Sequence, residues 1–186
     1  RREKEINPDT YLNIVMDFKK LVPLFEAYGI KLRGGNGEGE PEFSERGVFF
    51  NGDAHCGHKH FDLGIAWPAK QAAGVSTEPV VSGSWFAGAQ LEKRSCGGDC
   101  SHETLAFPLV IEPSEWQSSE NGKWFDFTKT AFKPYDWAVT AFLVIAKHYL
   151  GDKIIVSSDG SIEQWYEAMQ LCQLELGYGL EFKLRD

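Results

Sequence analysis

The chain has 186 residues, a length that fits one domain, and we expect a single domain over residues 1–186. Hydrophobic residues make up 42% and aromatic residues 13% of the sequence, which is ample material for a core. The formal net charge of −8 argues against non-specific binding to nucleic acids or anionic membranes, because a phosphate-binding surface needs an excess of cations. An acidic surface suits protein partners instead.

The expected compartment follows from three features of the sequence. No apolar run reaches the roughly 20 residues that span a bilayer. The first ten residues, RREKEINPDT, lack the apolar segment of a signal peptide. Four cysteines are too few for a disulfide scaffold. We therefore expect a cytoplasmic protein with no membrane association, in a reducing environment.

The first predicted element is a helix that begins at Asn7-Pro8, where a capping residue precedes a proline at the first helical position. Apolar residues then recur at helical spacing: Tyr11, Ile14, Val15, Phe18, Val22 and Phe25. Pro23 is expected to kink or divide this helix, and Gly29 to end it. A short strand at Ile30–Leu32 and a mobile, acidic loop at Gly34–Pro41 follow.

The middle of the chain is predicted to be rich in strands, separated by glycine and proline. The expected strands are Val48–Phe50, His60–Trp67, Val80–Phe86, Thr104–Ile111 and Trp124–Phe127. Asn51-Gly52 is a strong turn dipeptide, and we expect it to end the first of them. Together they predict a mostly antiparallel sheet.

The last third of the chain alternates between helices and strands. A helix from Pro134 to about Leu150 is apolar on nearly all sides, which predicts that it is buried. A strand at Lys153–Ser157 follows, and then a helix that ends at Gly177, opened by a capping box of Ser161 and Gln164. Leu180–Leu184 alternates like an edge strand. We thus expect an α+β fold, with about three helices, one of them buried, against a mostly antiparallel sheet.

Seven of the nine histidines and cysteines fall in two short windows, His55–His60 and Cys96–His102. If the first window is a strand, alternate side chains share a face, so Cys56, His58 and His60 point the same way. Gly97-Gly98 allows the tight path that lets two cysteines wrap an ion. Zinc favours such nitrogen and sulfur ligands. The predicted metal ligands are Cys56, His58, His60, Cys96, Cys100 and His102.

Several interpretations of these residues stay open. The site can be a structural zinc centre, or it can be a hydrolase centre with three ligands, a bound water and Glu103 or Asp53 as general base. Without a metal, the histidines are loop residues, and Cys96 and Cys100 are free thiols or a disulfide. The chain is then a binding module for a small ligand in an aromatic cleft. That cleft would be formed by Trp116, Trp124, Phe125 and Phe127.

The segment Phe127–Gly160 resembles a segment of uncharacterised bacteriophage and prophage proteins. The similar features are Lys129-Thr130, Lys133–Asp136, Ala146–His148, Gly151-Asp152 and Ser157–Gly160. The resemblance implies a viral or mobile-element setting and no particular activity. Both metal-candidate windows lie outside it. The leading hypothesis is an accessory or interaction protein that contains a structural zinc site.

Overall fold

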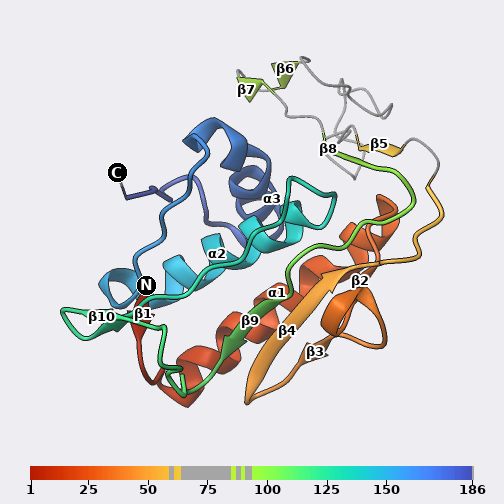
Figure 1. The fold of residues 1–186 in the computed structure, drawn as a ribbon. Coiled ribbons are helices and arrows are strands. Elements are labelled where there is room, and N and C mark those ends of the chain that lie inside the picture. Colours follow the sequence, from red (N-terminus) through yellow and green to blue (C-terminus); the bar gives the residue numbers. More distant parts are fainter. Residues whose placement is uncertain (59–60, 64–84, 87–88, 91–93, 186) are drawn as a thin grey trace.

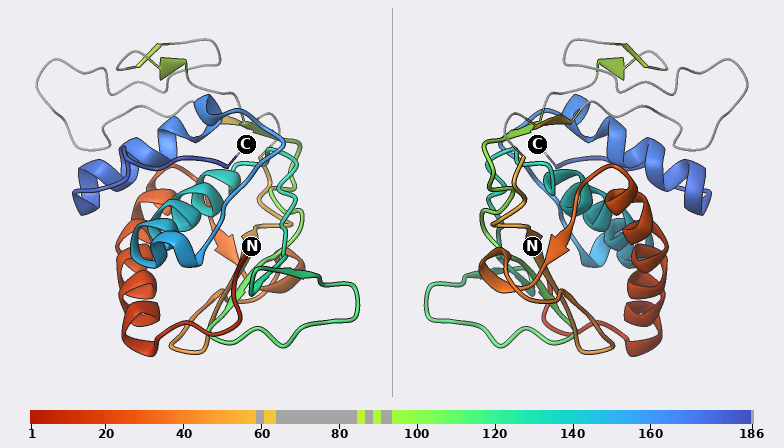
Figure 2. Two further views of the ribbon diagram at one scale, coloured as in Figure 1. Left: turned by 90° about the vertical axis from the view of Figure 1, so that its left-hand side faces the viewer. Right: turned by 90° about the vertical axis from the view of Figure 1, so that its right-hand side faces the viewer.

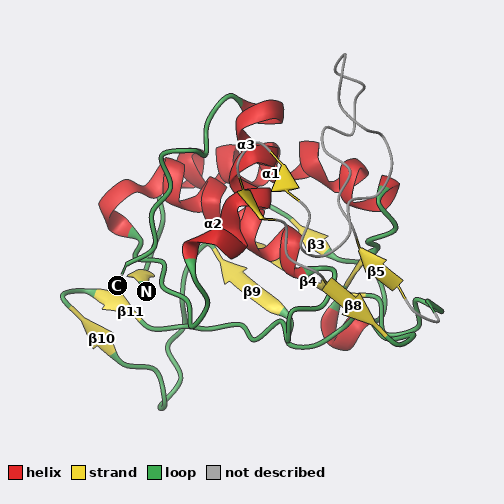
Figure 3. Cartoon of the chain, turned by 90° about the horizontal axis from the view of Figure 1, so that it is seen from above, coloured by secondary structure: helices red, strands yellow, loops and turns green. Residues whose placement is uncertain are grey.

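A computed structural model describes residues 1–58, 61–63, 85–86, 89–90 and 94–185. The predicted α+β class is confirmed, since helices α1 (Pro8–Ala27), α2 (Asp136–Leu150) and α3 (Tyr166–Leu176) accompany antiparallel strands. Figure 1 shows α2 lying between α1 and α3, with strands β4 and β9 in front of α1. In the view from above, helices form one layer and these strands another (Figure 3).

Strand β4 (Gly47–Gly52) is the centre of the main sheet. It pairs with β2 (Leu32–Arg33) and β3 (Glu42–Phe43) along one edge and with β9 (Leu105–Pro108) along the other, antiparallel throughout. The Phe50 ring stacks on Phe18 of α1 at 5.1 Å and meets Phe142 of α2 edge-on. These rings join the sheet to both helices in one hydrophobic core.

Helix α1 begins as predicted, because the Asn7 side chain accepts hydrogen bonds from the backbone N–H groups of Asp9 and Thr10. The expected division at Pro23 does not occur, and the helix runs through it to Ala27. Pro23 lies on the exposed side. The carbonyl four residues earlier, which the proline leaves without a helical donor, can therefore bond to water.

Helix α2 is buried as predicted, although it begins at Asp136 and not at Pro134. Trp137, Phe142 and Ala146 are completely buried, and these positions lie on different sides of the helix. The capping box predicted before α3 is absent, because Ser161 makes no side-chain cap and the first turn, Ile162–Trp165, is a 3₁₀ helix. The helix ends at Gly177 in the left-handed conformation, as the glycine predicts.

Shorter strands lie around this core. Strand β1 (Arg2–Glu3) pairs with β11 (Lys123–Trp124), which pairs with β10 (Ser119–Glu120). The two side views in Figure 2 show the green segment with β10 and β11 projecting from the body of the molecule. Strand β5 (Phe61–Leu63) pairs with β8 (Arg94–Cys96), and β6 (Trp85–Phe86) with β7 (Ala89–Gln90). The predicted strands at 60–67 and 80–86 are therefore confirmed only at 61–63 and 85–86, and their other residues lie outside the described part.

Two predicted strands are wrong, and of the predicted strand Trp124–Phe127 only Trp124 belongs to a strand, β11. Lys153–Ser157 and Leu180–Leu184 are extended or turn segments. Ile155 donates its N–H to Arg1 (2.7 Å) and Arg185 donates to Val156 (2.9 Å). The Arg1 ammonium donates to the Ile155 carbonyl (2.8 Å), and an isolated bridge joins Arg2 and Ile154. Apolar and polar residues thus alternate in Leu180–Leu184 without the continuous ladder of backbone hydrogen bonds that defines a sheet.

The sequence around Gly34–Pro41 is also folded differently from the loop we expected. Gly35–Gly37 forms a 3₁₀ turn, and the Gly37 carbonyl accepts from the N–H of Ala54 at 3.0 Å. A Cβ at Gly37 would lie 2.6 Å from the Cβ of Ser101. The segment therefore packs against both chain stretches that contain the candidate metal ligands. No helix of the described residues has the length and hydrophobicity needed to cross a membrane.

The Asp17 carboxylate joins α1 to α2 and to the C-terminal segment. It accepts hydrogen bonds from Tyr149 (2.6 Å), Tyr178 (2.8 Å) and Lys20 (2.6 Å). Burial opposes ionisation of this carboxyl, but the three donors outweigh burial and hold its pKa below the usual value. The network therefore favours the ionised form in the folded protein.

This network predicts a pH-dependent contribution to stability. Asp17→Asn is expected to lower the free energy of unfolding at pH 7 by about 2 kcal/mol, because charge-assisted bonds are lost. The folded-state pKa lies below the unfolded value of about 3.9, so the deficit should be complete above about pH 4 and shrink as pH falls through the folded-state pKa. Urea titrations at pH 7 and pH 3 measure this. Equal deficits at both pH values, or a deficit matched by the exposed Asp152→Asn control, would contradict it.

Candidate metal centre

The first stretch of candidate ligands follows the end of strand β4. Asp53 orders this turn, since its carboxylate accepts from the N–H of His55 (2.9 Å) and from Nε of Arg33 (3.0 Å). Gly57 has a φ of +72°, which reverses the chain between Cys56 and His58. Residues 54–58 are turn and coil, so the strand alternation that we expected to align Cys56 with His58 is wrong. The glycine turn brings them together instead.

The second stretch follows β8, which ends at Cys96. Gly98 has a φ of +101°, and this turn returns the chain to Cys100. The two stretches then meet backbone to backbone. Cys100 donates its N–H to the Asp53 carbonyl at 2.9 Å, and Gly57 donates to the Gly98 carbonyl at 3.4 Å. Figure 3 shows the same approach at the level of the strands, with β5 and β8 side by side beyond β4.

The dipeptide Asn51-Gly52, predicted as a turn, lies within β4 and holds the second stretch. The Asn51 carboxamide donates to the His102 carbonyl (2.9 Å) and accepts from the backbone N–H of His102 (3.0 Å). A Cβ at Gly52 would lie 2.0 Å from the Cys100 carbonyl oxygen, so only glycine admits this approach. The two residues therefore position Cys100 rather than reverse the chain.

These constraints bring four donor atoms to one place. The sulfurs of Cys56, Cys96 and Cys100 and a ring nitrogen of His58 all lie within 4.8 Å of one another. The two stretches are separated by more than 35 positions in the sequence, so this proximity is a tertiary feature. It is the convergence on which the predicted metal site depends.

The spacing of the donors matches a tetrahedral zinc site. With zinc–sulfur bonds of about 2.3 Å and zinc–nitrogen bonds of about 2.05 Å, the ligands of a tetrahedral ion lie about 3.8 Å apart for two sulfurs and about 3.6 Å for sulfur and nitrogen. The Cys56 and Cys96 sulfurs are 3.6 Å apart. His58 Nδ1 lies 3.4 Å from the Cys96 sulfur and 3.5 Å from that of Cys100. These distances leave room for one ion.

The cysteines are not joined as a disulfide. All four cysteines are free thiols. The separation of 3.6 Å between the Cys56 and Cys96 sulfurs far exceeds the roughly 2.05 Å of a disulfide bond. Cys172 is buried on α3, away from the other three cysteines, and its thiol lies 3.7 Å from the Ala141 carbonyl.

The surroundings of the four donors disfavour a thiolate at Cys100. Cys96 is 7% and Cys100 is 3% exposed, whereas Cys56 and His58 are partly accessible. Burial, followed by the neighbouring Cys96 and Cys56 thiols, raises the pKa of Cys100 far above its usual value. A bound cation reverses this preference, because it stabilises thiolates and displaces their protons.

Two of the six predicted ligands are not part of this group. His60 lies outside the described residues. The His102 ring lies away from the cluster, with its Nδ1 2.8 Å from the Lys129 carbonyl. Its backbone is bonded to Asn51, so in this structure His102 links β4 to the segment before α2. Its ring therefore has a hydrogen-bonding partner of its own.

The two carboxylates considered as general bases are engaged elsewhere. Asp53 binds Arg33 and the turn at His55, and Glu103 accepts the N–H of Lys129 at 2.7 Å. No aspartate or glutamate of the described residues joins the four donors. None of the four residues expected to form an aromatic cleft is buried. Trp116 and Phe127 are more than 45% exposed and pack edge-on at 5.7 Å.

A buried ion-pair network lies two residues before Cys96 and was not predicted from the sequence. Arg94 is completely buried and binds Glu167 of α3 and Asp136 of α2, with 3.3 Å between its Nη2 and the Asp136 carboxylate. Thr130 donates to the same carboxylate at 2.5 Å. The Phe132 ring covers the guanidinium at 5.1 Å. The only signal in the sequence was two acidic residues on otherwise buried helix faces.

The ion pairs attach the metal-candidate segment to the helices. Burial disfavours the charged guanidinium, but the Glu167 and Asp136 carboxylates outweigh burial and raise the pKa of Arg94. The chain is thus fixed at Arg94 by helices α2 and α3. At Cys100 it is fixed by the backbone of β4.

Comparisons with known proteins gave no match: no family model, no curated protein and no solved structure is similar to this chain. Function must therefore be argued from the chemistry of the described residues.

Removal of Arg94 should strongly destabilise the fold. Arg94→Met leaves two buried carboxylates without their cation, which costs about 3–5 kcal/mol in comparable sites. Urea unfolding monitored by circular dichroism measures the change. The matched control is Arg46→Met, at an exposed position, which should stay within about 0.5 kcal/mol of the parent. Equal effects of the two substitutions would show that the Arg94 network does not hold this segment.

Proposed function

We propose that Cys56, His58, Cys96 and Cys100 bind one zinc ion with a structural role, in an accessory protein that acts through protein partners. The observation that carries the metal proposal is the convergence of three sulfurs and one ring nitrogen within 4.8 Å. A set rich in thiolates favours zinc over harder cations such as magnesium or calcium.

Four protein ligands support a structural rather than a catalytic role. A catalytic zinc ion typically keeps three protein ligands and one open position for water. Here the four donors already account for a complete tetrahedron, and two of the three thiols are buried. The carboxylates proposed for the hydrolase are bonded to Arg33 and to the backbone. The hydrolase therefore has neither an open position nor an available base among these residues.

The proposed ion joins the two ends of a long stretch of chain. Cys56 and His58 precede residues 59–93 in the sequence, and Arg94 and Cys96 follow them. Holding the two ends of such a stretch together costs conformational entropy, and the binding free energy of a metal that joins them offsets that cost. Zinc serves this purpose in a reducing cytoplasm, where a disulfide does not persist.

The accessory role and its setting are supported by the charge of the chain and by its resemblance. The net charge of −8 favours protein partners over nucleic acid. The likeness of Phe127–Gly160 to uncharacterised phage and prophage proteins supports a viral or mobile-element origin. That segment includes Asp136, which binds Arg94 beside the metal centre. The proposal thus joins the resembling segment and the metal centre in one structural unit.

Zinc content and chelation test the structural role. Protein purified with zinc should contain one ion per chain by elemental analysis, and Cys100→Ser should lose most of it. Removal of zinc with a strong chelator should lower Tm by about 10 °C or more, since about 1 kcal/mol corresponds to 2–4 °C in a chain of this size. Cys172→Ala is the matched control, because Cys172 is buried away from the cluster and its loss should leave the zinc content unchanged.

The outcomes separate the competing functions. A chain that purifies without stoichiometric metal and does not bind added zinc contradicts the proposal and leaves the non-metal binding module. Zinc that leaves without a change in Tm, combined with zinc-dependent hydrolysis of a simple ester, favours the hydrolase and overturns the structural role.

A further inference from the structure

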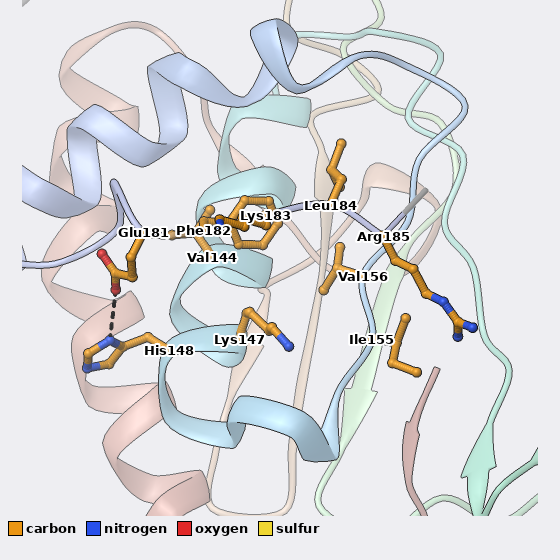
Figure 4. Close-up of a pocket in the computed structure, with 10 residues that line it drawn as sticks. All are labelled: Val144, Lys147, His148, Ile155, Val156, Glu181, Phe182, Lys183, Leu184 and Arg185. Atoms are coloured by element: carbon orange, nitrogen blue, oxygen red, sulfur yellow. Dashed lines mark hydrogen bonds and ion pairs between the residues drawn. The ribbon is translucent and has the colours of Figure 1, made fainter.

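A groove of about 490 Å³ lies beside the C-terminal half of helix α2. Three segments of the chain form it. The last turns of α2 form one wall, Ile155 and Val156 form a second, and the C-terminal segment 181–185 forms the third (Figure 4). Its volume is within the range of sites that bind small organic molecules. None of its residues belongs to the proposed metal centre.

The floor of the groove is apolar and firmly packed. Val144, Val156 and Phe182 are at most 7% exposed yet line the groove. The Phe182 ring stacks on Trp165 at 5.0 Å with an interplanar angle of 16°. Arg185 closes the floor by donating its N–H to the Val156 carbonyl. An apolar ligand would therefore meet a preformed surface.

The rim of the groove carries an excess of cations in a chain whose net charge is −8. The three cations are Lys147, Lys183 and Arg185. Lys147 is held in place, because its ammonium donates to the carbonyls of Gly151 (2.8 Å) and Ile154 (3.0 Å), which leaves one donor. No carboxylate of the described residues forms an ion pair with Lys183 or Arg185, and both are exposed.

The one acidic residue of the groove lies at the opposite end. Glu181 accepts from the N–H of Gly179 (2.8 Å) and lies 3.2 Å from Nδ1 of His148, whose ring stacks on Tyr178. Figure 4 shows Glu181 and His148 at one side and Arg185 at the other, with Lys147 and Ile155 between them. The groove is therefore polarised, with its uncompensated positive charge near Lys147 and Arg185.

We propose that this groove binds a small organic anion with an apolar body, of the alkyl carboxylate class. The carboxylate lies between Lys147 and Arg185, where a guanidinium offers two parallel donors and the ammonium its remaining one. The hydrocarbon lies over Val144 and Phe182. Neither the floor nor the rim suffices alone to bind this ligand. The floor has no charge for the carboxylate, and the rim does not enclose the hydrocarbon. The site is independent of the proposed zinc ion.

Calorimetric titration of the full, zinc-loaded chain with decanoate tests this proposal. Decanoate should bind with one saturable site, whereas decanol and inorganic phosphate, which carry only one of the two features, should each bind at least tenfold more weakly. Arg185→Glu should weaken decanoate binding about tenfold or more, because an attractive charge is replaced by a repulsive one. Lys19→Glu, an equal charge reversal at an exposed position on α1, should have no such effect.

Amide chemical shifts locate the bound ligand in the same titration. Shifts confined to residues 144–156 and 181–185 support the groove. Absence of saturable decanoate binding overturns the proposal, as does binding that Arg185→Glu and Lys19→Glu weaken equally or that shifts other regions instead. Equal affinity for decanol and decanoate would also overturn it, since the rim cations would then contribute nothing.

Discussion

Three thiols and one imidazole within 4.8 Å of each other form the contact on which the account depends. The donors come from two stretches of chain that are remote in sequence, so the backbone has to be held on both sides. Strand β4 does this through Asn51 and Gly52, which fix His102 and admit the Cys100 carbonyl. The ligands are thus placed by the end of strand β4 as well as by their own turns.

The same segment is anchored a second time by charge. Arg94 precedes Cys96 by two residues and pairs with Asp136 and Glu167 inside the helical layer. The proposed zinc ion neutralises thiolates on the sheet side, and the carboxylates neutralise a buried cation on the helix side. Each group is costly to bury alone and stable with its partner. Together they hold the segment from Arg94 to Cys100 at two points, one on the helices and one on the sheet.

Much of this architecture could be predicted from the sequence. The helical spacing of apolar residues and the Asn7 cap predicted helix α1. The hydrophobicity of α2 on nearly all sides predicted that this helix is buried. Clustering of histidine and cysteine gave all four converging donors. Local sequence patterns failed where tertiary contacts determine the structure. Asn51-Gly52 is a frequent turn dipeptide, yet the buried Asn51 carboxamide bonds to the His102 backbone and keeps the dipeptide in a strand. Arg94 could not be recognised, because a buried arginine and an exposed one look alike until their partners are placed.

The most direct test of the central claim is X-ray absorption spectroscopy at the zinc K edge of the purified, zinc-loaded chain. The account predicts a first shell of three sulfurs at about 2.3 Å and one nitrogen at about 2.0–2.1 Å, with no oxygen ligand. A shell dominated by nitrogen and oxygen, or one with a water in the fourth position, would contradict it. Either result would mean that Cys56, His58, Cys96 and Cys100 do not share one closed site.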